Sequence, residues 1–224
     1  MNHLVWARTP AARVFRYGTA TAVAAPALSG RDRIAVTGAP EDALPLVQDV
    51  LAEGGPTYRP FGPSGLIDEL VRAAPGLVPG GHPFLWMETA RRPADPAPEA
   101  AWLDERGEAA AAALLTGHFP DSYAQPGRAG VRRWAGAHDG SGRLLAVAAD
   151  AWSVPGCGFL AGVVTRPEAR GRGLAAAVSR FVVDALVRDH GRAALMVDAG
   201  NPAAIAVYER IGMHGYLFGA AAAG

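Results

Sequence analysis

The sequence predicts a mixed α/β fold, in which helices flank a central sheet that holds both parallel and antiparallel strands. In the second half of the chain, apolar runs of strand length alternate with amphipathic runs of helical period. Near the middle of this half, an apolar run ends at Thr165, a glycine-rich turn follows, and an amphipathic segment then begins. Strand, turn and helix in this order are typical of α/β proteins.

The first half, residues 1–92, is predicted to be an α/β accessory region without a chemical motif. Its helices are indicated by apolar residues at helical spacing, and its last strand by aromatic residues. A second interpretation, which the sequence leaves open, is that this region is a degenerate copy of the fold of the second half. The expected elements are strands at 13–17, 33–37 and 83–89 and helices at 41–53 and 64–74.

A second domain is predicted at residues 97–224, after a linker at 91–98 that is rich in arginine and proline. Asp104 is suited to cap the first helix, Gly191 to end the helix after the glycine-rich turn, and the tetrapeptide at 139–142 to form a hairpin turn. The expected strands are 100–103, 131–137, 143–152, 158–165, 193–197 and 213–218, and the expected helices are 104–115, 174–190 and 202–211. The nearly continuous apolar strand at 158–165 is expected to be buried on both faces.

The composition is that of a globular protein that can bury a sizeable core. The chain has 224 residues, and 50% of them are hydrophobic. Its 21 basic residues, all arginine, balance 21 acidic ones, and this zero net charge argues against nucleic acid or a membrane surface as a partner bound by bulk charge. No apolar run reaches the roughly 18 to 20 residues that a membrane span needs.

The N-terminus and the cysteine count favour a cytoplasmic protein without a metal site. An alanine-rich stretch at 20–28 follows several arginines, as in a weak signal peptide, but Pro26 and the low hydrophobicity favour a segment of the fold. Cys157 is the one cysteine, which excludes an internal disulfide and a thiolate metal site. No histidine lies beside it in sequence, so we expect a small residue at the entrance of a strand and not a nucleophile.

The turn at residues 170–175 is the segment best suited to bind a ligand. Gly171 and Gly173 allow the backbone to approach a ligand without an intervening Cβ atom. The first N–H groups of the following helix lie at the positive end of its dipole, which suits an anion such as a pyrophosphate. Arg170 and Arg172 can add positive charge.

Three kinds of phosphate-binding loop were compared with this turn. A Walker loop requires a lysine, and the chain contains none. The dinucleotide pattern Gly171-x-Gly173-x-x-Ala176, with Asp198 further on, fails because five residues separate the strand from the first glycine and too little chain follows for a doubly wound sheet. The third pattern, Arg170-x-x-Gly173-x-Ala175, resembles the loop of the GCN5-related N-acetyltransferase (GNAT) superfamily.

A second motif strengthens this resemblance. The segment from Asn201 through Tyr208-Glu-Arg-Ile to Gly212 looks like the later Asn…Tyr-Glu-x-x-Gly segment of the superfamily. The preceding Met-Val-Asp-Ala-Gly-Asn is similar to the glycine-N-acyltransferase-like (FR47-like) branch. The resemblance covers about the last hundred residues.

The resemblance implies the GNAT fold and an N-acetyltransferase that moves an acyl group from acetyl-CoA to a small-molecule or peptide amine by direct attack, without a metal. It implies that the strand before the turn pairs through its backbone with the pantetheine arm, that the turn binds the pyrophosphate, and that a tyrosine protonates the departing thiolate. The residues so assigned are Val163, Val164, Thr165, Arg170, Gly171, Arg172, Gly173, Leu174, Ala175 and Asn201 for the cofactor and Tyr208 for catalysis. The family's fold also places a helix near 119–123.

The general base is not identified by the sequence. The strand at 159–165 has no carboxylate, and a chain of water molecules can also deprotonate the amine. A non-catalytic acyl-CoA-binding or regulatory module is therefore the alternative function, a dinucleotide-binding protein is a third, and a homodimer is left open. The candidate bases, each of which also suits a structural role, are Asp198, Asp150, Glu88, His118 and His214.

Overall fold

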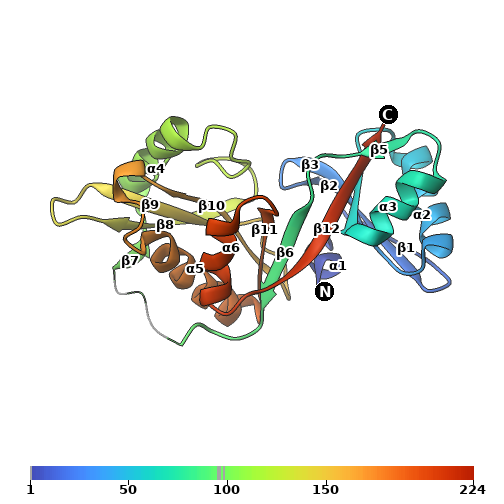
Figure 1. Cartoon of the computed structure of the whole chain (residues 1–224). Coiled ribbons are helices and arrows are strands. Elements are labelled where there is room, and N and C mark those ends of the chain that lie inside the picture. The colour runs from blue at the N-terminus through green and yellow to red at the C-terminus, as the bar shows by residue number, and fades with distance from the viewer. Residues whose placement is uncertain (1, 95–96, 98) are drawn as a thin grey trace. The chain divides into compact units, whose positions relative to one another are not determined.

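The computed structural model describes residues 2–94, 97 and 99–224 and has the mixed α/β fold that the sequence predicts (Figure 1). Two compact units divide the chain, and each contains its own strands and helices. The first unit comprises the residues up to Trp86 together with Met196–Pro202 and Gly215–Gly224. The second comprises Met87–Leu195 and Ala203–His214.

The predicted linker is described only in part. Positions 95, 96 and 98 lie outside the described residues. Arg92 belongs to the second unit, where its Nε atom lies 2.7 Å from Oδ1 of Asp184 in helix α5 (Leu174–His190). The boundary expected between domains 1–92 and 97–224 stays a prediction. None of the helices in the described part of the chain is long and apolar enough to cross a membrane.

The first unit is built around a sheet in the order β1-β2-β3-β4-β12, with β5 paired to β12. β1, β2 and β3 are antiparallel neighbours, β4 runs parallel to β3, and β12 runs antiparallel to β4 and β5. The strands are β1 (Arg13–Tyr17), β2 (Ala20–Leu28), β3 (Arg31–Thr37), β4 (Arg59–Pro63), β5 (Leu77–Pro79) and β12 (His214–Ala223), and the helices are α1 (His3–Trp6), α2 (Pro40–Gly54) and α3 (Ser64–Ala73). Strand β6 (Phe84–Thr89) leads from the first unit into the second.

The alanine-rich stretch at 20–28 is an internal strand of this sheet, which the sequence reading missed. Ala22 and Ala24 of β2 are buried in one cluster with Val47 of α2 and Leu70 of α3. Alanine is a weak strand former, so no periodic signal marked this strand. Its small side chains instead let the helices lie close to the sheet, which is a tertiary effect.

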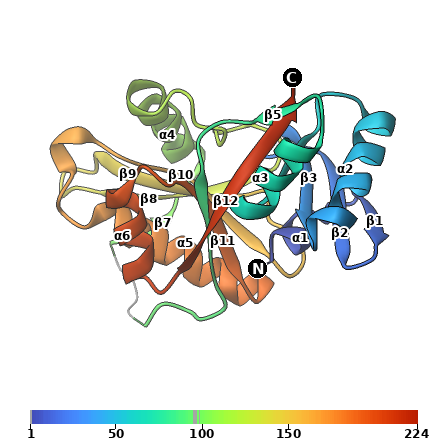
Figure 2. The same cartoon turned by 45° about the vertical axis from the view of Figure 1, so that its right-hand side comes forward.

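The second unit is built around a sheet in the order β11-β10-β9-β8-β7. Strands β7 to β10 pair antiparallel, and β10 pairs parallel with β11. Helices α4 and α5 lie on opposite sides of this sheet (Figures 1 and 2). The elements are β7 (Ala100–Trp102), α4 (Glu105–His118), β8 (Val131–His138), β9 (Leu144–Ala151), β10 (Gly158–Thr165), the 3-10 helix η1 (Pro167–Ala169), α5, β11 (Ala193–Asp198) and α6 (Pro202–Arg210).

In this half of the chain, the predicted hairpin turn and the predicted end of the helix at 174–190 are both confirmed. Asp139 Oδ1 accepts hydrogen bonds from the N–H groups of Ser141 and Arg143 in the predicted hairpin turn. Gly191 ends α5 with a φ of 75°. No helix forms at 119–123, where the chain makes turns.

The two units share one order of elements. Each has three antiparallel strands, then a helix, a strand parallel to the third strand, and a second helix. Helix α2 of the first unit therefore follows its third strand in the same way as α5 does in the second. This common order is what a degenerate copy of the second-half fold would have.

We predict that Asp104→Ala lowers the free energy of unfolding by about 1 kcal/mol, because it removes the cap of α4. Oδ1 of Asp104 accepts a hydrogen bond from the N–H of Gly107 at 2.8 Å. Urea denaturation followed by circular dichroism measures the change. Asp104→Asn is the matched control, since it keeps an acceptor oxygen. Equal stability of the alanine and asparagine variants would show that the cap contributes nothing.

Candidate functional site

The turn between β10 and α5 presents backbone N–H groups to open space. Gly171 has a φ of 74° and Gly173, the N-cap of α5, has a φ of 80°, so both adopt the left-handed conformation that favours glycine. A Cβ atom added at either position would meet nothing within 4 Å. No side chain caps this end of the helix. The turn therefore has room for an anionic group at the positive end of α5.

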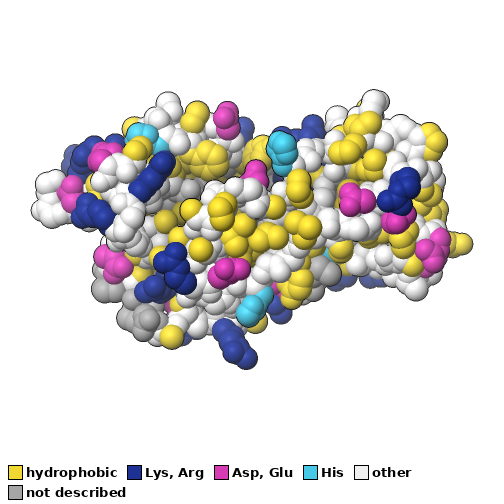
Figure 3. Space-filling view, in the orientation of Figure 1, with side chains coloured by type: hydrophobic (Ala, Val, Ile, Leu, Met, Phe, Trp, Pro, Cys, Tyr) yellow, Lys and Arg dark blue, Asp and Glu magenta, His cyan; other side chains and the backbone are white. Residues whose placement is uncertain are grey.

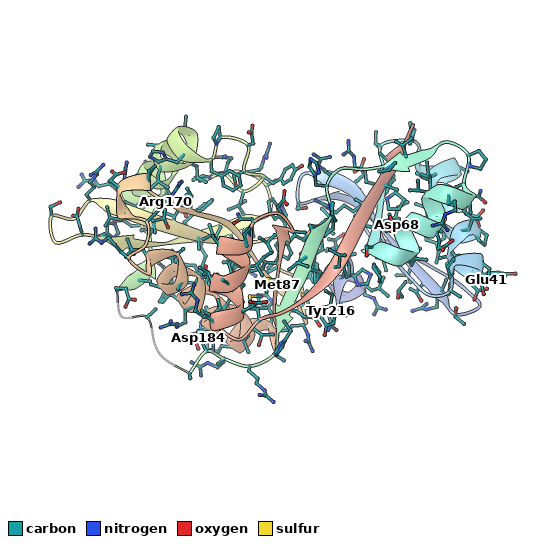
Figure 4. All side chains as sticks on the ribbon, in the orientation of Figure 1. Glu41, Asp68, Met87, Arg170, Asp184 and Tyr216 are labelled. Atoms are coloured by element: carbon teal, nitrogen blue, oxygen red, sulfur yellow. The ribbon has the colours of Figure 1, made fainter. Side chains whose placement is uncertain are left out.

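Two arginines, Arg170 and Arg172, belong to this turn, and Figure 3 shows basic side chains on the face of the second unit that it presents. Nε of Arg170, which is labelled in Figure 4, lies 3.4 Å from the carbonyl oxygen of Thr165. Arg172 has no ion-pair partner among the described residues. Glu168 of η1 is paired with Arg143 at 2.7 Å, and its own backbone N–H and the charge of Arg143 lower the pKa of its carboxyl group. The one acidic side chain of η1 is thus neutralised, and the turn keeps a net positive charge.

Strand β10 is paired with β11 over only its first two residues. On one side it pairs antiparallel with β9 as far as Thr165, which lies opposite Ala146. On the other side it pairs with β11 only at Gly158 and Phe159. From Leu160 onward, the edge toward β11 has no strand partner among the described residues. An extended ligand arm that carries amides can pair with such an edge.

The middle of β10 forms a β-bulge. The register with β9 shifts between Ala161 and Val164, and Gly162 has a φ of 64°. Residues 161–163 are half-buried, so the expectation that β10 is buried on both faces is wrong here. The reason is that the bulge and the unpaired edge leave this part of the strand without the cover that an ordinary internal strand has.

Tyr208 is the buried residue of α6, with 8% of its surface exposed. Its phenol makes no hydrogen bond to the described part of the chain. Burial raises the pKa of the Tyr208 phenol, which therefore stays protonated at neutral pH and can act as a donor. Its catalytic role stays a prediction.

Asn201 lies in a tight turn before α6. Its N–H donates to the carbonyl oxygen of Asp198 at 3.0 Å, and Oδ1 of Asp198 accepts from the N–H of Gly200 at 2.7 Å. Asp198 therefore has a structural role in this turn. Asn201 belongs to the first unit and Tyr208 to the second. A contact between Asn201 and the cofactor stays a prediction.

The two other carboxylates considered as bases are also engaged by neighbours. Asp150 is fully buried, with Oδ2 at 3.2 Å from Nε of Arg133 and Oδ1 accepting from Oγ of Ser153 at 2.6 Å. Glu88 is 6% exposed and lies 3.7 Å from Arg192. These contacts explain both carboxylates as parts of the core of the second unit.

The two candidate histidines are exposed at the ends of elements. His118 is the last residue of α4, and His214 is the first residue of β12. Across residues 2–94, 97 and 99–224, no three His, Cys, Asp or Glu side chains form a group that could hold a metal ion.

Two residues beside the turn and strand were missed by the sequence reading. Gly162 sits inside an apolar strand, a position that often marks a bulge, and this was the available signal. Trp134 of β8 packs its ring edge against Gly162, two strands away in the sheet. No sequence pattern relates these two positions, because the contact depends on the pairing of three strands.

Comparisons with known proteins agree with this geometry. Residues 136–217 match the family model described as FR47-like protein. No curated protein matches the chain significantly.

Solved structures with the same fold cover nearly the whole chain. A GCN5-related N-acetyltransferase from Kribbella flavida is 20% identical with a TM-score of 0.61, over 95% of this chain and 89% of that one. One from Sphaerobacter thermophilus is 18% identical with a TM-score of 0.61, over 91% of this chain and 76% of that one. An acetyltransferase of the GNAT family from Colwellia psychrerythraea is 11% identical with a TM-score of 0.57, over 100% of this chain and 89% of that one. At these identities the likeness shows the fold.

We predict that Cys157 is unreactive in the folded protein. Burial, and then the charge of Glu88, raise the pKa of the Cys157 thiol to about 12. The thiolate is the reactive form, so a disulfide reagent at pH 8 should label the native protein on the order of 1000-fold more slowly than the unfolded chain. Labelling of the native protein at the rate of a free thiol would contradict the burial of this side chain.

Proposed function

We propose that this chain is a member of the GNAT superfamily in its FR47-like branch and that it transfers an acyl group from coenzyme A to an amine. The match of residues 136–217 to the FR47-like family model and the likeness in fold to solved N-acetyltransferases support this proposal. The proposed co-substrate is acetyl-CoA, and the proposed acceptor is a small-molecule or peptide amine. The amine attacks the thioester directly, without an acyl-enzyme intermediate.

The observation that carries this proposal is the combination of an open turn and an unpaired strand edge in the second unit. The N–H groups of the turn at 170–175 suit the diphosphate of coenzyme A, and Arg170 and Arg172 add positive charge. The edge of β10 from Leu160 to Thr165 can pair with the amides of the pantetheine arm. An ordinary helix cap would need neither the open turn nor the unpaired strand edge. Because the two features lie on consecutive segments, they support a cofactor that carries both a diphosphate and an arm with amide groups.

The transfer step requires one proton for the departing thiolate. The nitrogen of the amine forms a bond to the thioester carbon, the carbon–sulfur bond breaks with its electron pair on sulfur, and the proposed acid Tyr208 donates its phenolic proton to that sulfur. The attacking nitrogen carries one extra proton after the bond forms, and it loses this proton to the tyrosinate, directly or through water, to leave the neutral amide. Burial raises the pKa of the phenol, so the proton is still on its oxygen at neutral pH when the thiolate departs.

Deprotonation of the incoming amine is assigned to water. Asp150 and Glu88 are held in ion pairs, and the strand at 159–165 has no carboxylate. The rate should therefore rise with pH until the acceptor amine is fully neutral, because only the neutral amine has the free electron pair that attacks.

We predict that Gly173→Glu abolishes binding of acetyl-CoA. The new carboxylate would stand where the diphosphate is proposed to bind, and the left-handed φ of 80° would be strained by any Cβ. Calorimetry should show a Kd raised by about 100-fold or more. Gly191→Glu is the matched control, since Gly191 has a similar φ of 75° and equally open surroundings at the other end of α5. Equal loss of binding in both variants would mean that strain, and not the site, is responsible.

We predict that Tyr208→Phe keeps acetyl-CoA binding and lowers turnover by about 100-fold or more, as removal of a general acid does. Free thiol released in the presence of a panel of amines measures turnover. The raised phenol pKa also predicts that kcat/KM of the native protein does not fall with pH up to about 10, because the acid remains protonated.

Normal turnover of the Tyr208→Phe variant would remove the acid assignment and leave the proposed activity standing. Binding of acetyl-CoA without thiol release with any amine would instead support the non-catalytic acyl-CoA-binding module. A protein that does not bind acetyl-CoA would overturn both functions.

A further inference from the structure

Trp134 is a buried aromatic residue whose ring is placed by strand pairing. It is 1% exposed and lies opposite Ala149 of β9, which in turn lies opposite Ala161 of β10. The three residues therefore form one row across three strands. Because Ala149 has only a methyl group, the indole of Trp134 can extend over it toward β10.

The ring edge of Trp134 fills the space beside Gly162. A Cβ atom at Gly162 would lie 2.5 Å from Cη2 and 2.9 Å from Cζ3 of the indole, and 3.2 Å from Cβ of Ala124. These contacts are at the residue of β10 that has a φ of 64°, inside the register shift between Ala161 and Val164. Indole and glycine are therefore complementary in size at the bulge.

Hydrogen bonding by the indole does not explain why position 134 is a tryptophan. Its Nε1 atom is buried and has no hydrogen-bond partner among the described residues. A buried N–H without a partner is unfavourable, and phenylalanine would avoid this penalty. The property that only tryptophan supplies here is the length of its ring, which reaches Gly162.

We propose that Trp134 is a positioning residue for acyl transfer, and that its ring edge holds β10 in the bulged conformation at residues 162–163. This inference rests on the proposed function, in which the pantetheine arm runs along β10 from the turn at 170–175 toward this bulge. The backbone of Gly162 and Val163 then faces the thioester, and the indole fixes where those backbone groups point. The diphosphate binds at the other end of the arm and does not depend on the indole.

The test is Trp134→Leu, with binding and turnover measured separately. We expect the Kd of coenzyme A to stay unchanged, because the turn and its arginines are intact. We expect kcat at saturating acetyl-CoA to fall about 100-fold, the effect of a displacement of about 1 Å at a reacting centre. Amide hydrogen exchange at residues 160–165 should become faster than in the native protein. Trp134→Phe, a milder change, should give a smaller loss of kcat and is available if the leucine variant does not fold.

The matched control is Trp102→Leu. Trp102 lies on β7 of the same sheet and contacts the guanidinium group of Arg133, the neighbour of Trp134, with Cζ at 3.9 Å from the ring centroid. Since alternate residues of a strand face opposite sides, this ring lies on the other face of the sheet. Its removal should leave kcat and exchange at 160–165 unchanged.

The outcomes separate the inference from the function on which it rests. An active native protein with equal kcat and equal exchange in Trp134→Leu overturns the inference alone. The same fall of kcat in Trp102→Leu also overturns it, because the effect would then be one of general stability. A native protein without turnover overturns the proposed function and the positioning role together.

Discussion

The constraint on which the second unit depends is the early end of pairing between β10 and β11. After Gly158 and Phe159, β10 keeps its antiparallel partner β9 but has no described partner on its other edge. Backbone N–H and C=O groups are strong hydrogen-bonding groups, and a protein seldom leaves a row of them without a partner inside a sheet. This is why we propose that a ligand pairs with the open edge of β10, at whose end the turn at 170–175 lies.

Local charge at that turn is set by position and not by composition. The chain as a whole is neutral, with 21 basic and 21 acidic residues. Arg170 and Arg172 nevertheless flank the positive end of α5, and Glu168 is paired with Arg143. In the first unit the corresponding helix α2 has Glu41 and Asp42 in its first turn, and Asp42 Oδ2 accepts hydrogen bonds from the N–H and hydroxyl groups of Thr19. Helix α5 therefore begins beside arginines, which suits the anion proposed to bind there, whereas the first turn of α2 is acidic.

The proposed chemistry places little demand on side chains. The diphosphate and the pantetheine arm would be held mainly by backbone groups, and one phenol would supply the proton. Side chains then act by shaping the backbone: glycines keep the turn open, and the ring of Trp134 fills the space beside Gly162. The carboxylates considered as bases, Asp150 and Glu88, are explained by their ion pairs with Arg133 and Arg192.

The sequence by itself determined those features that depend on neighbouring residues. The fold class, helices α2 to α6, the cap at Asp104, the hairpin at 139–142 and the glycine-rich turn all follow from local spacing and backbone preference, and each is present. Only the tertiary structure decided the rest. The alanine-rich strand β2, the bulge at Gly162 and its contact with Trp134 depend on which strands lie side by side, and the unpaired edge of β10 depends on where β11 diverges. Local backbone preference is a property of short segments and can be predicted from the order of residues. Strand pairing joins residues that lie far apart in the chain, so the order of residues did not predict it.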